Sequence, residues 1–299
     1  MRIERAVFGA LFVIAGLIPA AAQQPGEIVE IHVNRVKPGM TQQYEAGRKK
    51  HMAWHKSQND AWSWYTWAIL TGPATGSYVV GTFEHNWKDL DGRDNFTQAD
   101  GADSQANVGP SLAGTEQSYY RYRADLSLSK QTFPPAPLSS ITHFMLEPAG
   151  INDFTEGIKK VNEGIKKTNF PQAGPSRWYQ LVNGGESPHF VLVGDRAAWA
   201  NFQPPTDKTL DSMMEDAYGK EQGAAILNSL RKAVRSTITE ALQYRSDLSY
   251  VAAGAKMKEI SSVDAFRDWT HLPLFRNRRG YCSYAPHTPS ILRMILSPR

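Results

Sequence analysis

Short segments in which apolar and polar residues alternate recur along the chain and indicate strands with one buried face. The clearest lies at residues 27–36. Its two faces are formed by Val29, Ile31 and Val33 and by Glu30, His32 and Asn34. Apolar residues three and four positions apart indicate helices that bury one side. Residues 152–168 show this spacing, so the two patterns together predict a mixed α+β protein.

The predicted elements form two series of the same order, strand-helix-strand-strand-helix-strand. The first comprises strands at 27–36, 62–71, 77–83 and 117–126, with helical regions at 41–58 and 86–112. The second comprises strands at 140–146, 177–182, 189–193 and 244–251, with helical regions at 152–168 and 209–243. The long region at 209–243 is predicted to break near Gly219 or Gly223, because glycine is a poor helix former.

Landmark residues recur in the two series. Residues 122–127 (Tyr-Arg-Ala-Asp-Leu-Ser) reappear as residues 244–249 (Tyr-Arg-Ser-Asp-Leu-Ser). Four further matches keep the same order: Pro38-Gly39 with Pro148-Ala149-Gly150, Trp64-Tyr65 with Trp178-Tyr179, Val79-Val80-Gly81 with Leu192-Val193-Gly194, and Trp87 with Trp199. Ordered self-similarity indicates an internal duplication. The recurring Arg and Asp of the first match indicate a shared structural role.

This order of elements, the Pro-Gly after the first strand and the duplication resemble the dimeric α/β-barrel superfamily. Its members include NIPSNAP, EthD-like, antibiotic-biosynthesis monooxygenase, haem-degrading and chlorite-dismutase-type proteins. The resemblance covers about residues 26–252. It implies two tandem ferredoxin-like β-α-β-β-α-β units, at residues 26–128 and 139–252, that form a pseudo-dimeric α/β barrel. It also implies ligand sites between each sheet and its helices or between the sheets.

Three segments lie outside the two units. Residues 1–22 combine two arginines, an apolar run and Ala20-Ala21-Ala22, a pattern that predicts a cleaved signal peptide and a periplasmic or secreted protein. Residues 129–138 are rich in proline and predict a semi-rigid linker. Residues 253–299 match neither unit and are predicted to form a basic, poorly ordered tail. After signal removal, no segment is long and apolar enough to span a bilayer.

The charge is distributed unevenly. Of the formal net charge of +4, residues 1–22 carry +1 and residues 253–299 carry +5, which leaves −2 for residues 23–252. A nucleic-acid-binding domain is expected to carry a basic patch on its fold, so we exclude nucleic acid as the main partner. Cys282 is the only cysteine, which excludes an internal disulfide. Nucleotide-binding glycine motifs and Gly-x-Ser-x-Gly are absent from the sequence, so nucleotide cofactors and serine hydrolysis have no support.

Histidines on the first strand of each unit are candidates for chemistry. If the apolar face of the first strand meets the helices, its polar face, with Glu30, His32 and Asn34, points at the opposing sheet. Aligning the glycines that follow the two strands pairs His32 with His143, whereas aligning the prolines pairs it with Thr142. Two histidines facing one interior would suit acid/base chemistry, haem ligation or a metal site. Alternatively, they are buried polar groups that fix how the sheets pack.

Aromatic residues are the richest feature of the first unit. By strand alternation, Trp62 and Trp64 share one face and Tyr65 and Trp67 share the other. One face is then core, and the other can line an apolar ligand pocket with His85 near its mouth. The resemblance implies a cofactor-free site of Trp, Asn and His in monooxygenase-like members. The nearest equivalents here, by residue type, are His32, Asn34 and either Trp64 or Trp67. Alternatively, the rings fill the core between the sheets.

His51 and His55 lie four positions apart and therefore share one face of the first predicted helix. Such a pair can bind zinc, but the neighbouring Lys49, Lys50 and Lys56 indicate a solvated face. No HxH, HExxH or CxxC spacing accompanies the candidate histidines, so we predict no metal, and the cofactor is left open.

The function predicted from these features is that of an exported protein that binds a small, partly apolar ligand in the inter-sheet or sheet-helix cavity. One alternative is a cofactor-free monooxygenase or haem-handling enzyme, and another is an interaction module whose exposed sheet edges recruit a partner. Fold alone does not decide among these. The candidate catalytic residues are His32, His143 and Asn34, and the candidate ligand contacts are Glu30, Trp64, Trp67 and His85. We expect a monomer, as a pseudo-dimer, or a homodimer.

Overall fold

The structure is a computed structural model that describes residues 26–254. The predicted signal peptide and the tail beyond residue 254 lie outside the described residues. We call residues 26–128 the first half, residues 129–137 the linker and residues 138–254 the second half. The linker is one residue shorter than predicted, because the fifth strand already begins at Leu138.

The two halves contain the same series of strands and main helices. The first half comprises β1 (Ile28–Val36), α1 (Thr41–Ser57), β2 (Tyr65–Ile69), β3 (Tyr78–His85), α2 (Trp87–Asp91), α3 (Asp94–Asn107), the 3₁₀ turn η1 (Gly109–Ser111) and β4 (Leu112–Tyr122). The second half comprises β5 (Leu138–Leu146), α4 (Ile151–Thr168), β6 (Ser176–Asn183), β7 (His189–Arg196), η2 (Trp199–Phe202), α5 (Leu210–Tyr218), α6 (Lys220–Ala233), β8 (Val234–Tyr244) and η3 (Ser246–Leu248).

The eight strands form one closed antiparallel barrel in the order β1-β3-β2-β8-β5-β7-β6-β4, and β4 pairs back with β1. Within each half the order is the one expected for a ferredoxin-like unit. The halves are joined by β2 with β8 and by β4 with β6. Closure leaves no free strand edge among the described strands. A partner therefore cannot bind by pairing with a sheet edge of this barrel, as the interaction-module alternative required.

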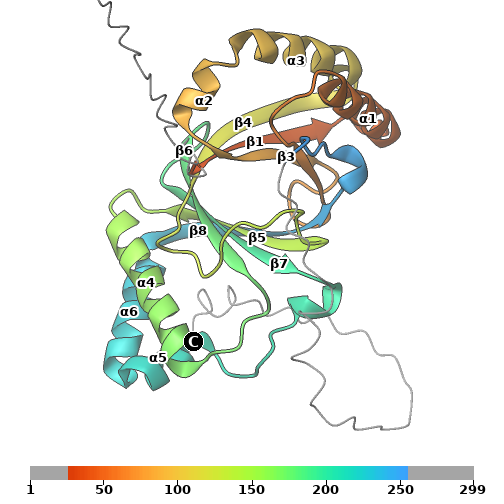
Figure 1. Ribbon diagram of the computed structural model, residues 1–299. Coiled ribbons are helices and arrows are strands. Elements are labelled where there is room, and N and C mark those ends of the chain that lie inside the picture. The colour runs from red at the N-terminus through yellow and green to blue at the C-terminus, as the bar shows by residue number, and fades with distance from the viewer. Residues whose placement is uncertain (1–25, 255–299) are drawn as a thin grey trace, which may run out of the picture.

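The helices cover the outside of the barrel on two opposite sides, with α1 to α3 over the first half and α4 to α6 over the second (Figure 1). The second half has a large apolar core between its helices and strands, which includes Phe144, Phe154 and Leu230. The first half has smaller apolar clusters around Tyr44 and Met52. No helix within residues 26–254 combines the length and apolar character needed to cross a membrane.

The orientation predicted for β1 is wrong. Its apolar residues Val29, Ile31 and Val33 line the interior of the barrel, whereas Asn34 on the polar face bonds to Tyr44 of α1. Both faces of a strand are buried in such a barrel, so apolar character does not by itself identify the face that meets the helices. The polar face of β1 is accommodated because the inward side of α1 is itself polar.

The end of the second half also differs from the prediction. The long helical region ends at Ala233, and residues 234–244 form β8. Val234, Thr237, Ile238 and Thr239 are β-branched and favour a strand, which outweighs the helical spacing of neighbouring residues. The predicted break at Gly219 is present, with φ +82, a conformation that favours glycine.

The recurring Tyr-Arg-x-Asp-Leu-Ser sequence forms a tight turn after the closing strand of each half. Arg123 binds Asp125 through two nitrogens, and Arg245 binds Asp247 in the same way, which agrees with the structural role predicted for these pairs. In the first turn Arg123 N–H donates to Trp178. In the second turn the corresponding bond goes to Thr66, so Trp178 corresponds to Thr66 and not to Trp64.

These turns also exchange side chains between the halves. Leu126, which follows β4 of the first half, is buried in the core of the second half. Leu248, which follows β8 of the second half, is buried beside Tyr44 and Tyr78 in the first half. Both leucines are fully buried, so each half completes the core of the other.

Candidate functional site

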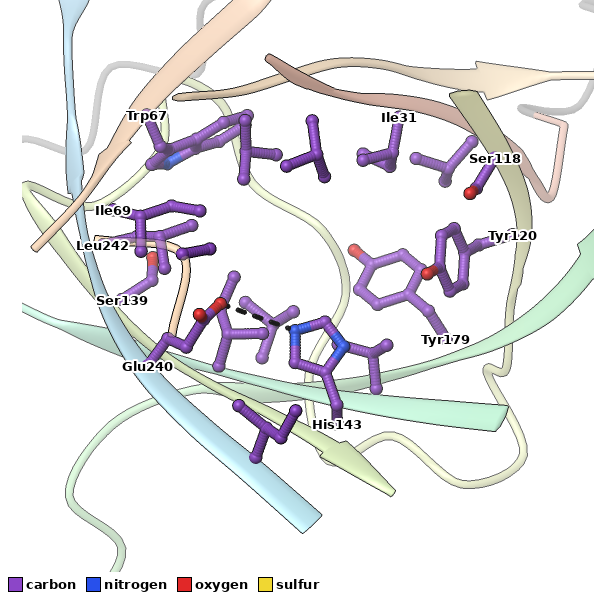
Figure 2. Close-up of a pocket in the computed structure, with 18 of the residues that line it drawn as sticks. Ile31, Trp67, Ile69, Ser118, Tyr120, Ser139, His143, Tyr179, Glu240 and Leu242 are labelled. Atoms are coloured by element: carbon purple, nitrogen blue, oxygen red, sulfur yellow. Dashed lines mark ion pairs between the residues drawn. The ribbon is translucent and has the colours of Figure 1, made fainter. Parts of the chain in front are cut away.

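The barrel encloses a cavity of about 440 Å³. Such a volume falls within the range of small-molecule sites, which are mostly apolar with a few convergent polar groups. Figure 2 shows side chains from both halves pointing into it. The apolar part of the lining includes Val29, Ile31, Val33, Trp67, Ile69, Val79, Phe83, Ile141, Val191, Val193 and Leu242.

The linker contributes to the cavity as well as joining the halves. Gln131 and Pro135 lie in the cavity lining. Between them in the sequence, Phe133 stacks on Tyr65 with a ring-centroid distance of 4.6 Å and an interplanar angle of 15°. Offset aromatic pairs of this kind hold rings in place. The linker is therefore packed against the interior face of the first half.

His143 and Glu240 are the central polar groups of the cavity. They project from the neighbouring strands β5 and β8, and His143 Nε2 lies 3.8 Å from Glu240 Oε2 (Figure 2). This separation is too long for a good hydrogen bond. A hydroxyl group placed between the two atoms can contact both, since it can donate to the carboxylate and accept from an imidazole N–H.

His189 supports the other side of the His143 ring. His143 Nδ1 and His189 Nε2 are 3.1 Å apart, so one ring donates a hydrogen bond to the other. Burial, together with the nearby His143, lowers the pKa of His189 to about 4. His189 is therefore neutral at pH 7 and serves as a fixed hydrogen-bond partner of His143.

Tyr120 and Tyr179 place phenol groups on the opposite wall (Figure 2). The Tyr179 hydroxyl donates to Gln131 of the linker. Burial raises the pKa of Tyr120 to about 12 and raises that of Tyr179 as well. Both phenols therefore stay protonated at neutral pH. Tyr120 can donate a hydrogen bond to a ligand, whereas the Tyr179 hydrogen is held by Gln131 and its oxygen can accept one.

The two arginines in the lining are already paired. Arg177 is buried and bonds through two nitrogens to Asp195, at 2.8 and 2.6 Å. Arg35 bonds to Glu116 at 2.5 Å. A buried pair of this kind is costly to break, since it would leave an uncompensated charge. The Arg177 guanidinium is therefore not available to neutralise an anionic ligand, whereas the Arg35–Glu116 pair is about half exposed and holds Arg35 only weakly.

The predicted site residues are divided between two faces of the barrel. His143 and Trp67 line the cavity. The other five predicted residues lie on the helix side of the first half: Glu30, His32, Asn34, Trp64 and His85. The structure therefore does not bring these seven residues together. In the two matching strand arrangements, His32 occupies the position equivalent to Thr142, as in the alignment of the prolines.

Residues on the helix side form a polar network of their own. His32 Nε2 lies 2.8 Å from Glu30 Oε1, which also accepts a hydrogen bond from Gln117. His85 stacks on Trp62 at a centroid distance of 3.6 Å and bonds to Thr82. These partners satisfy the polar groups within the protein, and Trp64 is packed beside Met52.

Sequence reasoning missed Glu240, His189, Tyr120 and Tyr179. Glu240 was hidden because residues 234–243 were assigned to a helix. His189 marks the start of a strand that was predicted, and alternation along it could have placed the side chain on the same face as Val191 and Val193. Tyr120 reaches the site through the pairing of β4 with β6 between the halves, which has no signal in a single sequence.

The expectation of a solvated His51–His55 face is wrong. Both histidines are buried, at 3% and 1% exposure, beneath α3. Trp54 stacks on His51 and contacts His55 edge-on. The three lysines around the pair extend from the remaining sides of α1, which is why their presence did not indicate the environment of the histidines.

No protein-family model matches the chain, and the comparison with curated proteins finds no match. Solved structures with a similar fold include an anthrone oxidase-like protein, with TM-score 0.47, 12% identity and coverage of 77% of this chain and 94% of that one. A putative monooxygenase from Lactobacillus acidophilus NCFM has TM-score 0.46, 10% identity and coverage of 77% and 98%. Chlorite dismutase from Candidatus Nitrospira defluvii has TM-score 0.42, 8% identity and coverage of 73% and 92%. At these values the likeness carries no argument about function.

Proposed function

We propose that the protein binds a neutral, largely apolar small molecule that carries a hydroxyl group, inside the barrel. The observation that carries this proposal is the cavity inside the barrel, with its apolar walls and the separated His143–Glu240 pair. The apolar walls supply the driving force for binding, at about 25 cal/mol for each Å² removed from water. The polar pair selects and orients the ligand.

Charge arguments favour a neutral ligand. The arginines of the lining are held by carboxylates, and Glu240 is buried next to the cavity. An anionic ligand would meet a carboxylate without a free cation and would lose its hydration. A hydroxyl group avoids this cost because it satisfies Glu240 and His143 together.

Haem, which the resemblance suggests for some relatives, fits this lining poorly. His143 could serve as an axial ligand, since haem iron is commonly held by histidine. The propionate groups, however, would need cationic partners, and Arg35 and Arg177 are already paired with Glu116 and Asp195. We therefore assign haem no role in this cavity.

A second candidate activity is proton abstraction from the bound hydroxyl group, as in a cofactor-free monooxygenase. It is favoured by the position of His143, whose Nε2 faces the cavity while Nδ1 is held by His189. This activity uses the His143 tautomer in which Nδ1–H donates to His189 and Nε2 accepts the proton, whereas binding alone uses the tautomer with Nε2–H. A base with one nitrogen fixed and the other facing the substrate is the usual arrangement for acid/base catalysis. His32 and Asn34 lie outside the cavity and take no part in this proposal.

We also propose that the barrel arose by duplication within one chain. The two halves are tandem copies of one ferredoxin-like unit, supported by the matching strand orders, the matching Arg–Asp turns and the reciprocal burial of Leu126 and Leu248. The barrel would then be complete in a single chain. Residues 1–22 direct export, and the mature protein begins near Gln23.

Binding can be tested with 1-naphthol, a hydroxylated aromatic probe, and naphthalene, which lacks the hydroxyl group. The mature protein is purified after export, its mass is measured to locate the new N-terminus, and each probe is titrated calorimetrically. We expect 1-naphthol to bind more tightly than naphthalene. Glu240→Gln should weaken 1-naphthol binding roughly tenfold, or about 1.4 kcal/mol. Oxygen uptake in the same samples tests the second candidate.

Two further variants make the result decisive. Ile141→Trp fills the cavity and should abolish binding of both probes, whereas Val182→Ala, at an exposed position, should leave it unchanged. Circular dichroism confirms that both variants fold. Undiminished binding in a folded Ile141→Trp protein would place the ligand elsewhere and overturn the proposal.

A further inference from the structure

A second cluster lies on the helix side of the first half, away from the cavity. His51 and His55 of α1 meet Asp100 of α3. His51 Nε2 and His55 Nε2 each lie 3.2 Å from Asp100 Oδ1, and the two nitrogens lie 3.3 Å apart. Three potential ligand atoms thus form a nearly equilateral triangle.

The remaining nitrogen of each histidine is held by another carboxylate. His51 Nδ1 lies 2.8 Å from Asp103 Oδ1, and His55 Nδ1 lies 2.9 Å from Asp60 Oδ2. Asp60 is fixed in turn by Arg93 at 2.8 Å and by the Trp64 indole at 3.0 Å. A carboxylate on the second nitrogen of a histidine is the arrangement that orients metal-binding histidines.

This arrangement leaves lone pairs facing one another. Because each Nδ1 donates its hydrogen to a carboxylate, each Nε2 of a neutral histidine carries a lone pair directed into the triangle. Asp100 Oδ1 is buried and faces the two Nε2 atoms at 3.2 Å, so it receives no hydrogen bond from them when both histidines are neutral in this form. Buried polar atoms are costly when unpartnered. A cation at the centre of the triangle would satisfy all three atoms together.

The second half shows that the fold does not need histidine at these positions. Helix α4 follows β5 as α1 follows β1, and its inward face is apolar, with Val161 and Ile165 packed on the core. The inward positions of α1 are occupied by His51 and His55. At the inward helix positions, the first half therefore carries titratable histidines, whereas the second half carries apolar residues that stabilise its core.

From these observations we infer that His51, His55 and Asp100 bind a divalent first-row transition metal ion of the Zn²⁺ type. Tetrahedral Zn²⁺ with bonds of 2.0–2.1 Å separates its ligand atoms by about 3.3 Å, which matches the triangle. Two imidazoles favour such ions over Mg²⁺ and Ca²⁺, which prefer oxygen ligands. Three protein ligands leave one position for water.

The ion would anchor α3 to the rest of the first half. None of the residues of α3 is buried, so apolar packing holds this helix weakly. Its polar contacts with α1 include those of Asp100 and Asp103 with His51, and Phe96 adds a ring contact with Trp54 at a centroid distance of 5.3 Å. A bond from Asp100 to a metal held by two histidines of α1 would fix the helix firmly, since metal binding in such sites stabilises the folded state.

The test uses the untagged mature protein after removal of metals with a chelator. Zn²⁺ is titrated calorimetrically, Co²⁺ binding is followed by its visible spectrum, and hydrogen exchange of residues 94–107 is measured with and without Zn²⁺. We expect one Zn²⁺ per chain, a tetrahedral Co²⁺ spectrum and slower exchange in α3. Mg²⁺ should produce none of these effects. Absence of Zn²⁺ binding would overturn the inference.

Variants locate the ion. Asp100→Asn and His55→Gln should abolish binding. Asp103→Asn should weaken it about 10–100-fold, because Asp103 holds the His51 ring in place through Nδ1. Asp91→Asn removes an exposed carboxylate of the same region and should leave binding unchanged. If His55→Gln fails to fold, Asp100→Asn, at the partly exposed edge, decides the question. Unchanged binding in a folded Asp100→Asn protein would overturn the inference.

Discussion

At the scale of single residues, His189 makes stability depend on pH. Its pKa is lowered to about 4 by burial and by His143, whereas an unfolded histidine has a pKa of 6.5. Above pH 6.5 neither state binds the proton, so stability is unaffected. As the pH falls from 6.5 to 4, the unfolded state takes up a proton that the folded state rejects, and about 3 kcal/mol of stability is lost.

Between pH 7 and pH 5, the free energy of unfolding of the wild type should therefore fall by about 2 kcal/mol more than that of His189→Gln, because glutamine does not titrate. Urea unfolding at both pH values, with a chelator present, measures this difference. His85, whose pKa is also lowered to about 4 by burial, gives an independent case on the other face of the barrel. His85→Gln should show a similar change, and equal losses in wild type and both variants would contradict the prediction.

The residue scale is also where sequence reasoning was least complete. Alternation correctly separated Trp64 from Trp67 and grouped His32 with Asn34. It could not decide which group faces the cavity, because a barrel strand is buried on both sides. The outcome depends on α1, whose inward side is polar and so accepts the polar face of β1. The burial of His51 was hidden for a related reason, since the acidic partners on α3 lie far along the chain.

At the scale of elements, the turns after β4 and β8 are predicted to be major sources of stability. Leu248→Ala should cost about 2–5 kcal/mol, because it opens a space among fully or nearly fully buried side chains such as Tyr44 and Val108. Leu126→Ala should cost a similar amount in the core of the second half. Urea unfolding at pH 7 measures both values.

Val251→Ala is the matched control, since Val251 is exposed and close to Leu248 in the sequence. Its effect should stay within about 0.5 kcal/mol. A loss of less than about 1 kcal/mol in Leu248→Ala would mean that the exchanged turn is dispensable.

Element order was largely predictable, because turn residues and periodicity mark most boundaries. The strand at 28–36, the helix at 41–57 and the hairpin around Asn183 agree closely with the prediction. Residues 234–244 show where prediction of the elements from the sequence fails. Their helical spacing and their β-branched residues favour different structures, and pairing with β5 and β2 settles the outcome.

At the scale of the whole molecule, the cavity depends on pairing between the halves. Its lining draws on β1 to β4 of the first half and on β5 to β8 of the second. Neither half alone encloses it. A single sequence indicates two similar units, but the registers of β2 with β8 and of β4 with β6 arise only when both are folded.

The same pairing predicts that the barrel survives a cut in its linker. A specific protease site inserted next to the exposed Lys130 allows the linker to be cleaved after folding. The fragments should remain together, because two strand pairings and the buried side chains of Leu126 and Leu248 cross between them. Phe133 would stay stacked on Tyr65 from the other fragment. Native mass spectrometry should find one copy of each fragment in a single particle, with the circular dichroism of the uncut protein. Separation of the fragments without denaturant would show that the linker, and not the shared core, holds the halves together.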